Sequence, residues 1–70
     1  ADEILTRMRW FKGEIKFHRH CRAHHAVRRF FGDEKFHDAQ VRFHHRRIKE
    51  LRNERFRYWG DAFADAMNLP

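Results

Sequence analysis

Seven histidines and one cysteine are the side chains of this 70-residue sequence that could bind a metal ion. His20 and His24, like Cys21 and His25, are four residues apart, so each pair would share one face of a helix. A zinc site is conceivable that consists of Cys21, His25 (or His24), His44 and one more ligand, because zinc accepts thiolate and imidazole ligands. Strong zinc-binding sequences carry short Cys or His pairs at both ends of the site, which this sequence lacks. We therefore expect no metal or other cofactor, and Cys21, His25 and His44 are the weak zinc candidates.

The histidines allow two other interpretations. His37 and His44 fit the apolar arc of an amphipathic helix as polar fillers, and His24 and His45 fit ordinary exposed positions. Histidines among arginines have a disfavoured charged form, so they would add positive charge only as the pH falls. We favour this pH-dependent basic surface over metal binding, because it requires no particular geometry. Cys21 is interpreted as a small buried apolar residue, because no carboxylate or oxyanion-stabilising group accompanies it as a nucleophile.

Positive charge is the strongest signal in the composition. Sixteen Lys and Arg face ten Asp and Glu, which gives a formal net charge of +6. Two stretches, 16–30 and 40–49, contain no acidic residue, and an antiparallel hairpin would bring them side by side. Arginine is suited to forked contacts with phosphate or carboxylate. The residues predicted to bind nucleic acid or an acidic partner are Arg19, Arg22, Arg28, Arg29, Arg42, Arg46, Arg47 and Lys49.

Nucleic acid is the first predicted partner of this basic surface. Helix-turn-helix spacing, zinc-finger spacing and RNP motifs are absent from the sequence, so we expect contacts with the phosphate backbone rather than with bases. The alternative is a protein-interaction module: a small adaptor, inhibitor or assembly subunit, of a type also encoded by phages, that docks on an acidic protein. Its aromatic anchors would be Trp10, Phe17, Phe30 and Phe31. A basic face that is only solvated is a third possibility.

The sequence contains few residues that could support catalysis. It contains no serine, its only threonine is Thr6, and it has no glycine-rich phosphate loop. Asp61 and Asp65 have the four-residue spacing that would place two carboxylates on one helix face, but they lie near the end of the chain, where they fit a capping or solubilising role. We therefore predict that the protein is not an enzyme.

Three features predict a cytoplasmic protein. No apolar run approaches the ~18 residues of a membrane span. The first four residues, Ala1 to Ile4, have neither the basic nor the apolar region of a secretory signal. A single cysteine allows no internal disulfide, which is typical of a reducing compartment. Binding to a membrane surface is not expected either, because the apolar arc of the second helix has a use against the first.

The elements that would position these residues are two long helices. Strand-favouring residues are few, and the only proline is Pro70. Gly32 can take the left-handed position that ends a helix, and Asp33 can cap the next one. We predict one all-α domain over 1–70, with helix 1 at about 3–31, a turn at 32–33 and helix 2 at about 34–67. A two-residue turn between long helices favours an antiparallel hairpin.

Apolar periodicity is clearer in the second helix than in the first. One arc of helix 2 contains Val41, His44, Ile48, Leu51, Tyr58, Trp59, Ala62 and Ala66, with His37 and Arg55. Helix 1 has a stripe of Ile4, Met8, Phe11 and Ile15 that runs into His18, Arg22, His25 and Arg29. A second line lies beside it and contains Trp10, Phe17, Cys21 and His24. Because one neighbour cannot cover both lines, we expect a homodimer, plausible as a four-helix bundle.

Overall fold

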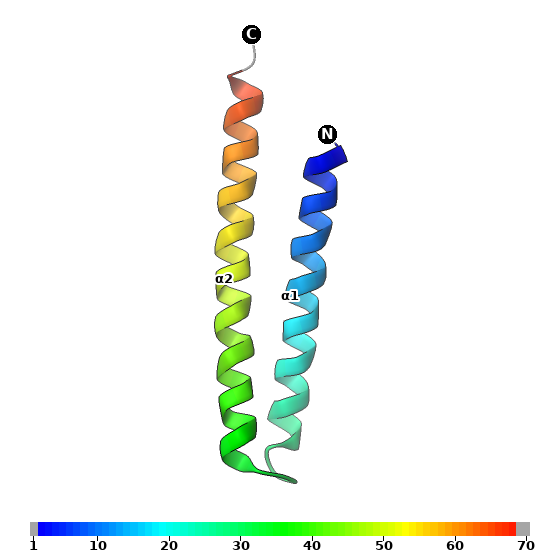
Figure 1. Cartoon of the computed structure of the whole chain (residues 1–70), viewed down its shortest axis with the longest axis vertical. Helices are drawn as coiled ribbons and strands as arrows, with labels where there is room; N and C mark the ends of the chain where they lie inside the picture. Colours follow the sequence, from blue (N-terminus) through cyan, green and yellow to red (C-terminus); the bar gives the residue numbers. More distant parts are fainter. Residues whose placement is uncertain (1, 69–70) are drawn as a thin grey trace.

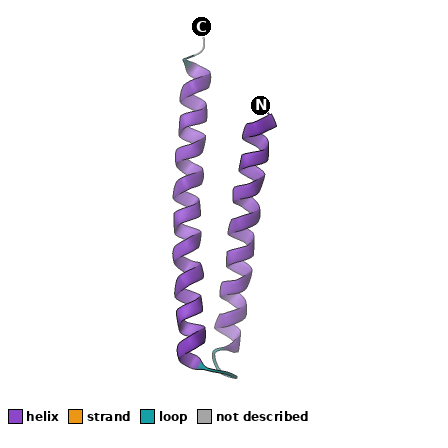
Figure 2. Ribbon diagram, viewed as in Figure 1, coloured by secondary structure: helices purple, strands orange, loops and turns teal. Residues whose placement is uncertain are grey.

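The computed structural model describes residues 2–68, and these form two helices. Helix α1 spans Asp2–Arg28 and helix α2 spans Glu34–Met67. They run antiparallel and side by side, with the start of α1 and the end of α2 at the same end of the molecule (Figure 1). The described residues contain helices and one short connection but no strand (Figure 2). The predicted all-α helical hairpin is confirmed for this part of the chain.

Helix α2 begins as its sequence predicts. Asp33 has extended backbone angles, with φ −70° and ψ 103°, and its Oδ1 accepts a hydrogen bond from the backbone N–H of Phe36 at 3.2 Å. This bond satisfies one of the amide groups that the first turn of a helix leaves unpaired. Glu34 adds a negative charge beside the positive end of the helix dipole.

The connection differs from the prediction. Helix α1 ends at Arg28 rather than near 31, so the link covers 29–33 instead of two residues. The helix closes with a tight bond in which the Phe31 amide donates to the Arg28 carbonyl at 2.9 Å. This closure needs no left-handed residue, and the predicted left-handed conformation of Gly32 is wrong, since no glycine has a positive φ. A Cβ on Gly32 would lie 3.0 Å from Nε2 of His37, so glycine lets the link pass close to that ring.

The contact between the helices is a single seam with the alternating three- and four-residue spacing of a coiled coil. From α1 the seam contains Ile4, Met8, Phe11, Ile15, His18, Arg22, His25 and Arg29, the last just beyond the helix end. From α2 it contains His37, Val41, His44, Ile48, Leu51, Arg55, Tyr58 and Ala62. All are buried or partly exposed. Trp59 and Ala66, which the sequence placed in the same arc, are exposed beside the seam.

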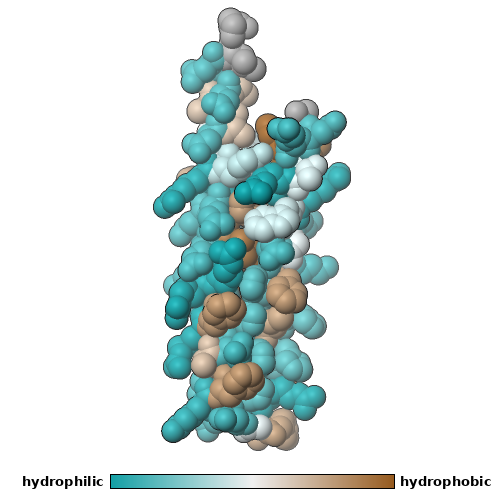
Figure 3. Space-filling model, in the orientation of Figure 1, coloured by the Kyte–Doolittle hydropathy of each residue, from teal (hydrophilic) through white to brown (hydrophobic). Residues whose placement is uncertain are grey.

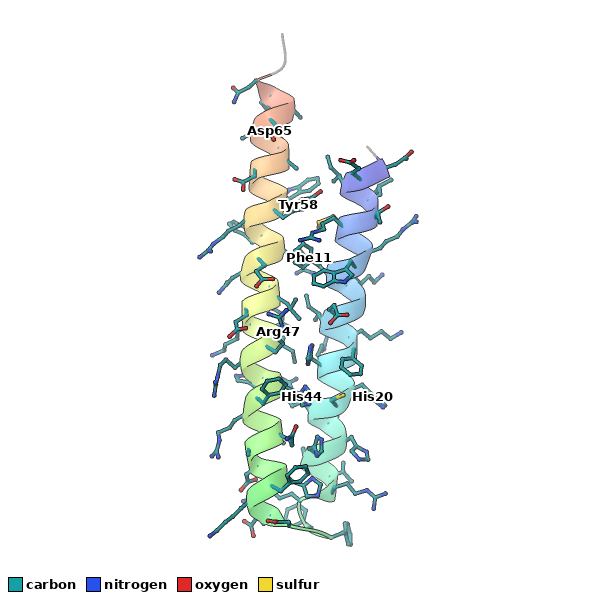
Figure 4. The ribbon with its side chains drawn as sticks, viewed as in Figure 1. Phe11, His20, His44, Arg47, Tyr58 and Asp65 are labelled. Atoms are coloured by element: carbon teal, nitrogen blue, oxygen red, sulfur yellow. The ribbon has the colours of Figure 1, made fainter. Side chains whose placement is uncertain are left out.

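The apolar core is small and lies in the middle of the seam. Phe11, Ile15, Ile48 and Leu51 are its buried residues, with exposed fractions between 0 % and 6 %, and Tyr58 packs against them. Figure 4 shows Phe11 and Tyr58 lying between the two helices. Toward the turn, histidines occupy the seam positions where a coiled coil ordinarily has aliphatic residues.

Candidate functional site

Four histidines meet in two pairs between the core and the turn. Nδ1 of His18 lies 2.7 Å from Nδ1 of His44, and both side chains are buried. Nδ1 of His25 lies 2.8 Å from Nδ1 of His37. The rings of His25 and His44 stack between the pairs, with centroids 6.0 Å apart and planes 12° from parallel. We call these four residues the histidine ladder. The sequence predicted His37 and His44 to face α1, and the structure confirms this.

The two middle rings of the ladder resist protonation. Burial lowers the pKa of His44 below its usual 6.5, and the neighbouring His18 and His25 lower it further. The pKa of His25 is also lowered, first by burial and then by His37 and His24. His18, at one end of the ladder, has a carboxylate in reach, because Glu14 Oε2 lies 3.9 Å from its Nε2.

The weak zinc candidates do not form a binding set. Across residues 2–68, no three His, Cys, Asp or Glu side chains gather where they could hold one metal ion. His25 and His44 stack face to face, so their ring nitrogens do not converge on one point. Cys21 is partly exposed rather than buried as predicted, and its thiol is free.

Basic side chains gather along one side of the seam, which we call the basic face. In an antiparallel coiled coil the e positions of both helices flank the seam on one side, and the b positions extend that side outward. The seam residues Arg22 and Arg55 contribute to it as well. The exposed cations at the b and e positions are Arg9, Lys12, Lys16, Arg19, Lys35, Arg42, Lys49 and Arg52.

Grooves between the helices follow this face. One groove of about 450 Å³ is lined by Lys12, Lys16, Arg19 and Arg55, with Ile15 at its floor. The next, of about 500 Å³, is lined by Met8, Arg52, Asn53, Arg55, Phe56 and Trp59. Arg55 borders both, so the two grooves are neighbours. Lys12, Arg52 and Arg55 were not among the residues that the sequence singled out for binding.

Few carboxylates compete for the cations of the basic face. Among the described residues, the acidic side chains at its b and e positions are Asp2, at the open end of the hairpin, and Asp38. Asp38 is already engaged, because its Oδ1 lies 2.7 Å from Nε of Arg29. That contact is an ion pair without the alignment of a hydrogen bond. Arg22 donates to Nδ1 of His45 at 3.1 Å, which fixes its guanidinium on this side of the seam.

The eight predicted binding residues do not form one surface. Three of them lie on the basic face: Arg19, Arg42 and Lys49. The side chain of Arg22, a seam residue, is directed to the same side by its hydrogen bond to His45. Arg28 and Arg47 occupy g positions on the other side of the seam, and Arg46 points away from α1.

Two of these eight residues, both arginines, are bound to carboxylates. Arg29 bonds to Glu34 at 2.8 Å as well as to Asp38, and Arg47 reaches Glu50 at 3.3 Å and Glu54 at 3.6 Å. A bound phosphate would have to compete with those carboxylates for the same N–H groups. The free cations of the basic face need no such exchange.

The net charge is confined to one half of the molecule. Residues 15–51, the half that contains the turn, carry ten Lys or Arg and four Asp or Glu. The remaining residues carry six of each sign. The whole excess of +6 therefore lies in the turn half, as the sequence predicted once a hairpin was assumed.

The opposite side of the seam is aromatic. The exposed rings of Trp10, Phe17, Phe36 and Phe43 lie at c positions there, and we call this side the aromatic face. Figure 3 shows hydrophobic atoms on this side on both helices, and Figure 4 shows Arg47 on the same side. Its charges nearly balance, with four arginines and five carboxylates: Arg7, Arg28, Arg47, Arg57, Glu3, Glu14, Glu50, Glu54 and Asp61.

A repeated dipeptide builds this face. In Phe17-His18, Phe36-His37 and Phe43-His44 the histidine enters the seam and the phenylalanine stands beside it, edge to face. The ring centroids are 5.0–5.2 Å apart and the planes meet at 71–78°. Trp10-Phe11 has the same arrangement, at 5.1 Å and 73°. Each exposed ring therefore covers the edge of a seam ring.

The predicted aromatic anchors are all exposed but do not lie together. Trp10 and Phe17 lie on the aromatic face, whereas Phe30 and Phe31 lie in the link, where they are the most exposed large apolar side chains of the turn half. Phe36 and Phe43 complete the aromatic face and were missed. The recurrence of Phe-His was the available signal, because each histidine of that dipeptide falls on a seam position.

Comparisons with known proteins add no relative: no family model, curated protein or solved structure matches the chain. Within residues 2–68, neither helix contains an apolar segment of the length needed to cross a bilayer. The two faces of the hairpin are therefore the features from which a function can be inferred.

Proposed function

We propose that the protein binds nucleic acid through the phosphate backbone, using the basic face. The observation that carries this proposal is the segregation of charge: eight exposed cations, together with Arg22 and Arg55, share one side of the seam with two carboxylates. Phosphates bound along this side would replace condensed counterions, and the release of those ions favours binding. Six arginines belong to this set and can form forked bonds with phosphate oxygens: Arg9, Arg19, Arg22, Arg42, Arg52 and Arg55.

The shape of the hairpin favours contacts with the backbone over reading of bases. The basic face runs along a rod that extends 59 Å, and its cations come from both helices. A rod of this kind can follow several successive phosphates, which fixes position without sequence information. The aromatic face lies on the other side of the seam and its charges nearly cancel, so it contributes little to this attraction.

A second part of the proposal is a homodimer formed through the aromatic face. Twelve large apolar side chains of the described residues remain exposed in the single chain, which is many for a hairpin with four buried apolar residues. Packing of two aromatic faces would bury Trp10, Phe17, Phe36 and Phe43 and give a four-helix bundle. The basic faces would then point outward on both sides, so that a dimer could hold two nucleic-acid segments.

The alternative partner is a protein with an acidic surface. The observation that favours it is the exposure of Phe30 and Phe31 in the link, which a dimer through the aromatic face leaves uncovered. Aromatic and arginine side chains dominate the energetics of protein interfaces. Such a partner would dock at the turn end, where the net charge is concentrated.

A salt titration tests the nucleic-acid proposal. Binding of nuclease-treated protein to duplex and single-stranded fragments of mixed sequence is followed by fluorescence anisotropy as KCl is raised from low to physiological concentration. We expect the logarithm of the affinity to fall linearly with the logarithm of salt, by about 0.9 per duplex phosphate contacted. Absence of binding at low salt contradicts the proposal. Light scattering after size exclusion reports the mass of the same sample, and a monomer at micromolar concentration contradicts the dimer.

A further inference from the structure

The turn half of the seam depends on histidines for its contact between helices. The buried apolar residues all lie at or above the level of Ile15 and Ile48, toward the open end. Between that level and the link, the buried contacts are made by the two histidine pairs and the stacked rings of His25 and His44, beside the partly exposed Val41. The other polar contacts here involve exposed or partly exposed groups: the Arg22–His45 hydrogen bond and the ion pairs of Arg29 with Glu34 and Asp38. Whatever changes the protonation of the ladder therefore acts directly on the closure of this half.

Each pair can hold only one hydrogen between its facing nitrogens. In a neutral pair one ring donates its Nδ1–H and the other accepts with its lone pair, so the two rings must be different tautomers. One extra proton turns one ring into an imidazolium, which can still donate its Nδ1–H to the neutral ring. When both rings are protonated, two N–H groups face each other 2.7 Å or 2.8 Å apart, where neither has an acceptor. The hydrogen bond is then lost and replaced by repulsion between two imidazolium ions.

The surroundings offer the protonated ladder little compensation. On α1 the nearby charged or titratable groups are Glu14, Arg22, His24 and Arg29; on α2 and its start they are Glu34, Asp38, His45 and Arg47. Their carboxylates are mostly taken: Glu34 and Asp38 bind Arg29, and Glu50 and Glu54 bind Arg47. Glu14 serves His18 alone, at 3.9 Å. The titratable neighbours that act on the middle rings, His25 and His44, are other histidines.

We propose that the histidine ladder is a proton-sensitive lock on the turn half of the hairpin, closed at neutral pH and opened at acidic pH. Opening separates the last turns of α1 from the first turns of α2, while the apolar core keeps the open-end half together. The proposal concerns the hairpin itself and does not depend on what the basic face binds.

The sign of the pH dependence follows from the two middle rings. Burial and neighbouring histidines hold the pKa values of His25 and His44 below 6.5 in the closed hairpin, whereas exposed histidine has a pKa near 6.5. The opened state therefore binds more protons than the closed state once the pH falls below about 6.5. The stabilising effect of the neutral ladder is complete above that pH and is lost as the pH falls through the lowered values. Each extra proton taken up on opening multiplies the opening constant by about ten per pH unit.

Hydrogen exchange on the full chain, free of nucleic acid, tests the lock. Amide protection factors, corrected for intrinsic rates, are compared between pH 7 and pH 5, a range in which most carboxylates stay ionised. We expect protection over 18–28 and 36–45 to fall by about tenfold to a hundredfold, and protection around Phe11 and Leu51 to change much less. Equal protection at the two pH values overturns the proposal, as does a uniform loss along both helices.

Two variants test whether the pH-dependent loss of protection comes from the ladder or from histidines in general. The double substitution His18→Leu with His44→Leu removes one pair and should reduce the pH-dependent loss of protection by at least about threefold. The matched control, His20→Leu, changes an exposed histidine on the outer side of α1 and should leave the loss unchanged (Figure 4). The same loss in all three proteins overturns the lock. If the double variant does not fold, NMR titration of the unmodified chain decides: midpoints of His25 and His44 at or above 6.5 contradict the proposal.

Discussion

Nδ1 of His18 lies 2.7 Å from Nδ1 of His44, at a level of the seam where two-stranded coiled coils ordinarily pack aliphatic side chains. The bond gives each of two buried polar rings a hydrogen-bond partner. The hairpin needs this bond in order to close, but the bond adds little to the free energy of unfolding. A buried hydrogen bond contributes about 1 kcal/mol, while a buried ring that loses its partner is destabilised by about 1–3 kcal/mol.

Changing one or both members of this pair should have opposite effects. We expect His44→Ala to lower the free energy of unfolding by about 1–3 kcal/mol at pH 7.5, because His18 loses its partner and a cavity remains. Replacing both rings by leucine should be neutral or stabilising, since apolar residues of similar size need no hydrogen bond. Urea unfolding followed by circular dichroism measures both. A double variant less stable than His44→Ala contradicts this account of the pair.

The small core makes its members unusually important. Leu51 is completely buried, and Leu51→Ala should lower the free energy of unfolding by about 2–5 kcal/mol, which is enough to unfold a marginal hairpin. Val27 is 66 % exposed, and Val27→Ala provides the matched control with an expected change within about 0.5 kcal/mol. Thermal unfolding of the two variants compares them. Similar midpoints would place the stabilising contacts outside the described core.

Two glycines should respond in opposite directions to alanine. Nothing lies within 4 Å of a Cβ added to Gly13, so Gly13→Ala should raise the free energy of unfolding by about 0.5–1 kcal/mol through helix propensity. A Cβ on Gly32 would lie 3.0 Å from Nε2 of His37, so Gly32→Ala must displace that ring from His25 and should be destabilising by about 1 kcal/mol. Denaturant midpoints distinguish the two. Stabilisation by Gly32→Ala would show that the ladder near the link is not tightly held.

The N-cap of α2 gives a local test of the link. Asp33→Ala removes the acceptor of the Phe36 amide and should be destabilising by about 1 kcal/mol, whereas Asp33→Asn keeps an oxygen in the same place and should change stability much less. Chemical denaturation at fixed protein concentration measures the difference. Equal effects of the two substitutions would mean that the negative charge at the helix start, rather than the hydrogen bond, stabilises the cap.

The helices and most of the seam could be predicted from the sequence because their signals are local. Asp33 marked the start of α2, and the stripe from Ile4 to Ile15 marked the buried side of α1. The same stripe continues through His18 and His25, and the sequence showed this continuation without explaining how polar residues could be buried there. Only the pairing across the helices shows why histidine is tolerated there: each ring finds its partner on the other helix.

The link and the two faces were harder to predict. Phe30 and Phe31 are compatible with a longer helix. The end of α1 at Arg28 depends instead on where the chain must reverse so that the seam residues of α2 lie opposite those of α1. The division of the cations depends on the register: Arg46 and Arg47 are adjacent in sequence, yet neither lies on the basic face, while Lys49 does. A charge count along the sequence locates the basic half but cannot assign its residues to one side.

Comparing two variants of equal net charge tests the basic face most directly. In one, Lys12, Arg19 and Lys49 of the basic face are replaced by glutamine; in the other, Arg28, Arg46 and Arg57, which are exposed off that face, are replaced in the same way. Dissociation constants for one duplex fragment are measured across a salt series. We expect the first variant to bind about tenfold more weakly or worse, with a salt slope smaller by about 2 to 3, and the second to change by less than about threefold. Equal losses in the two variants would show that net charge alone, and not the basic face, governs binding.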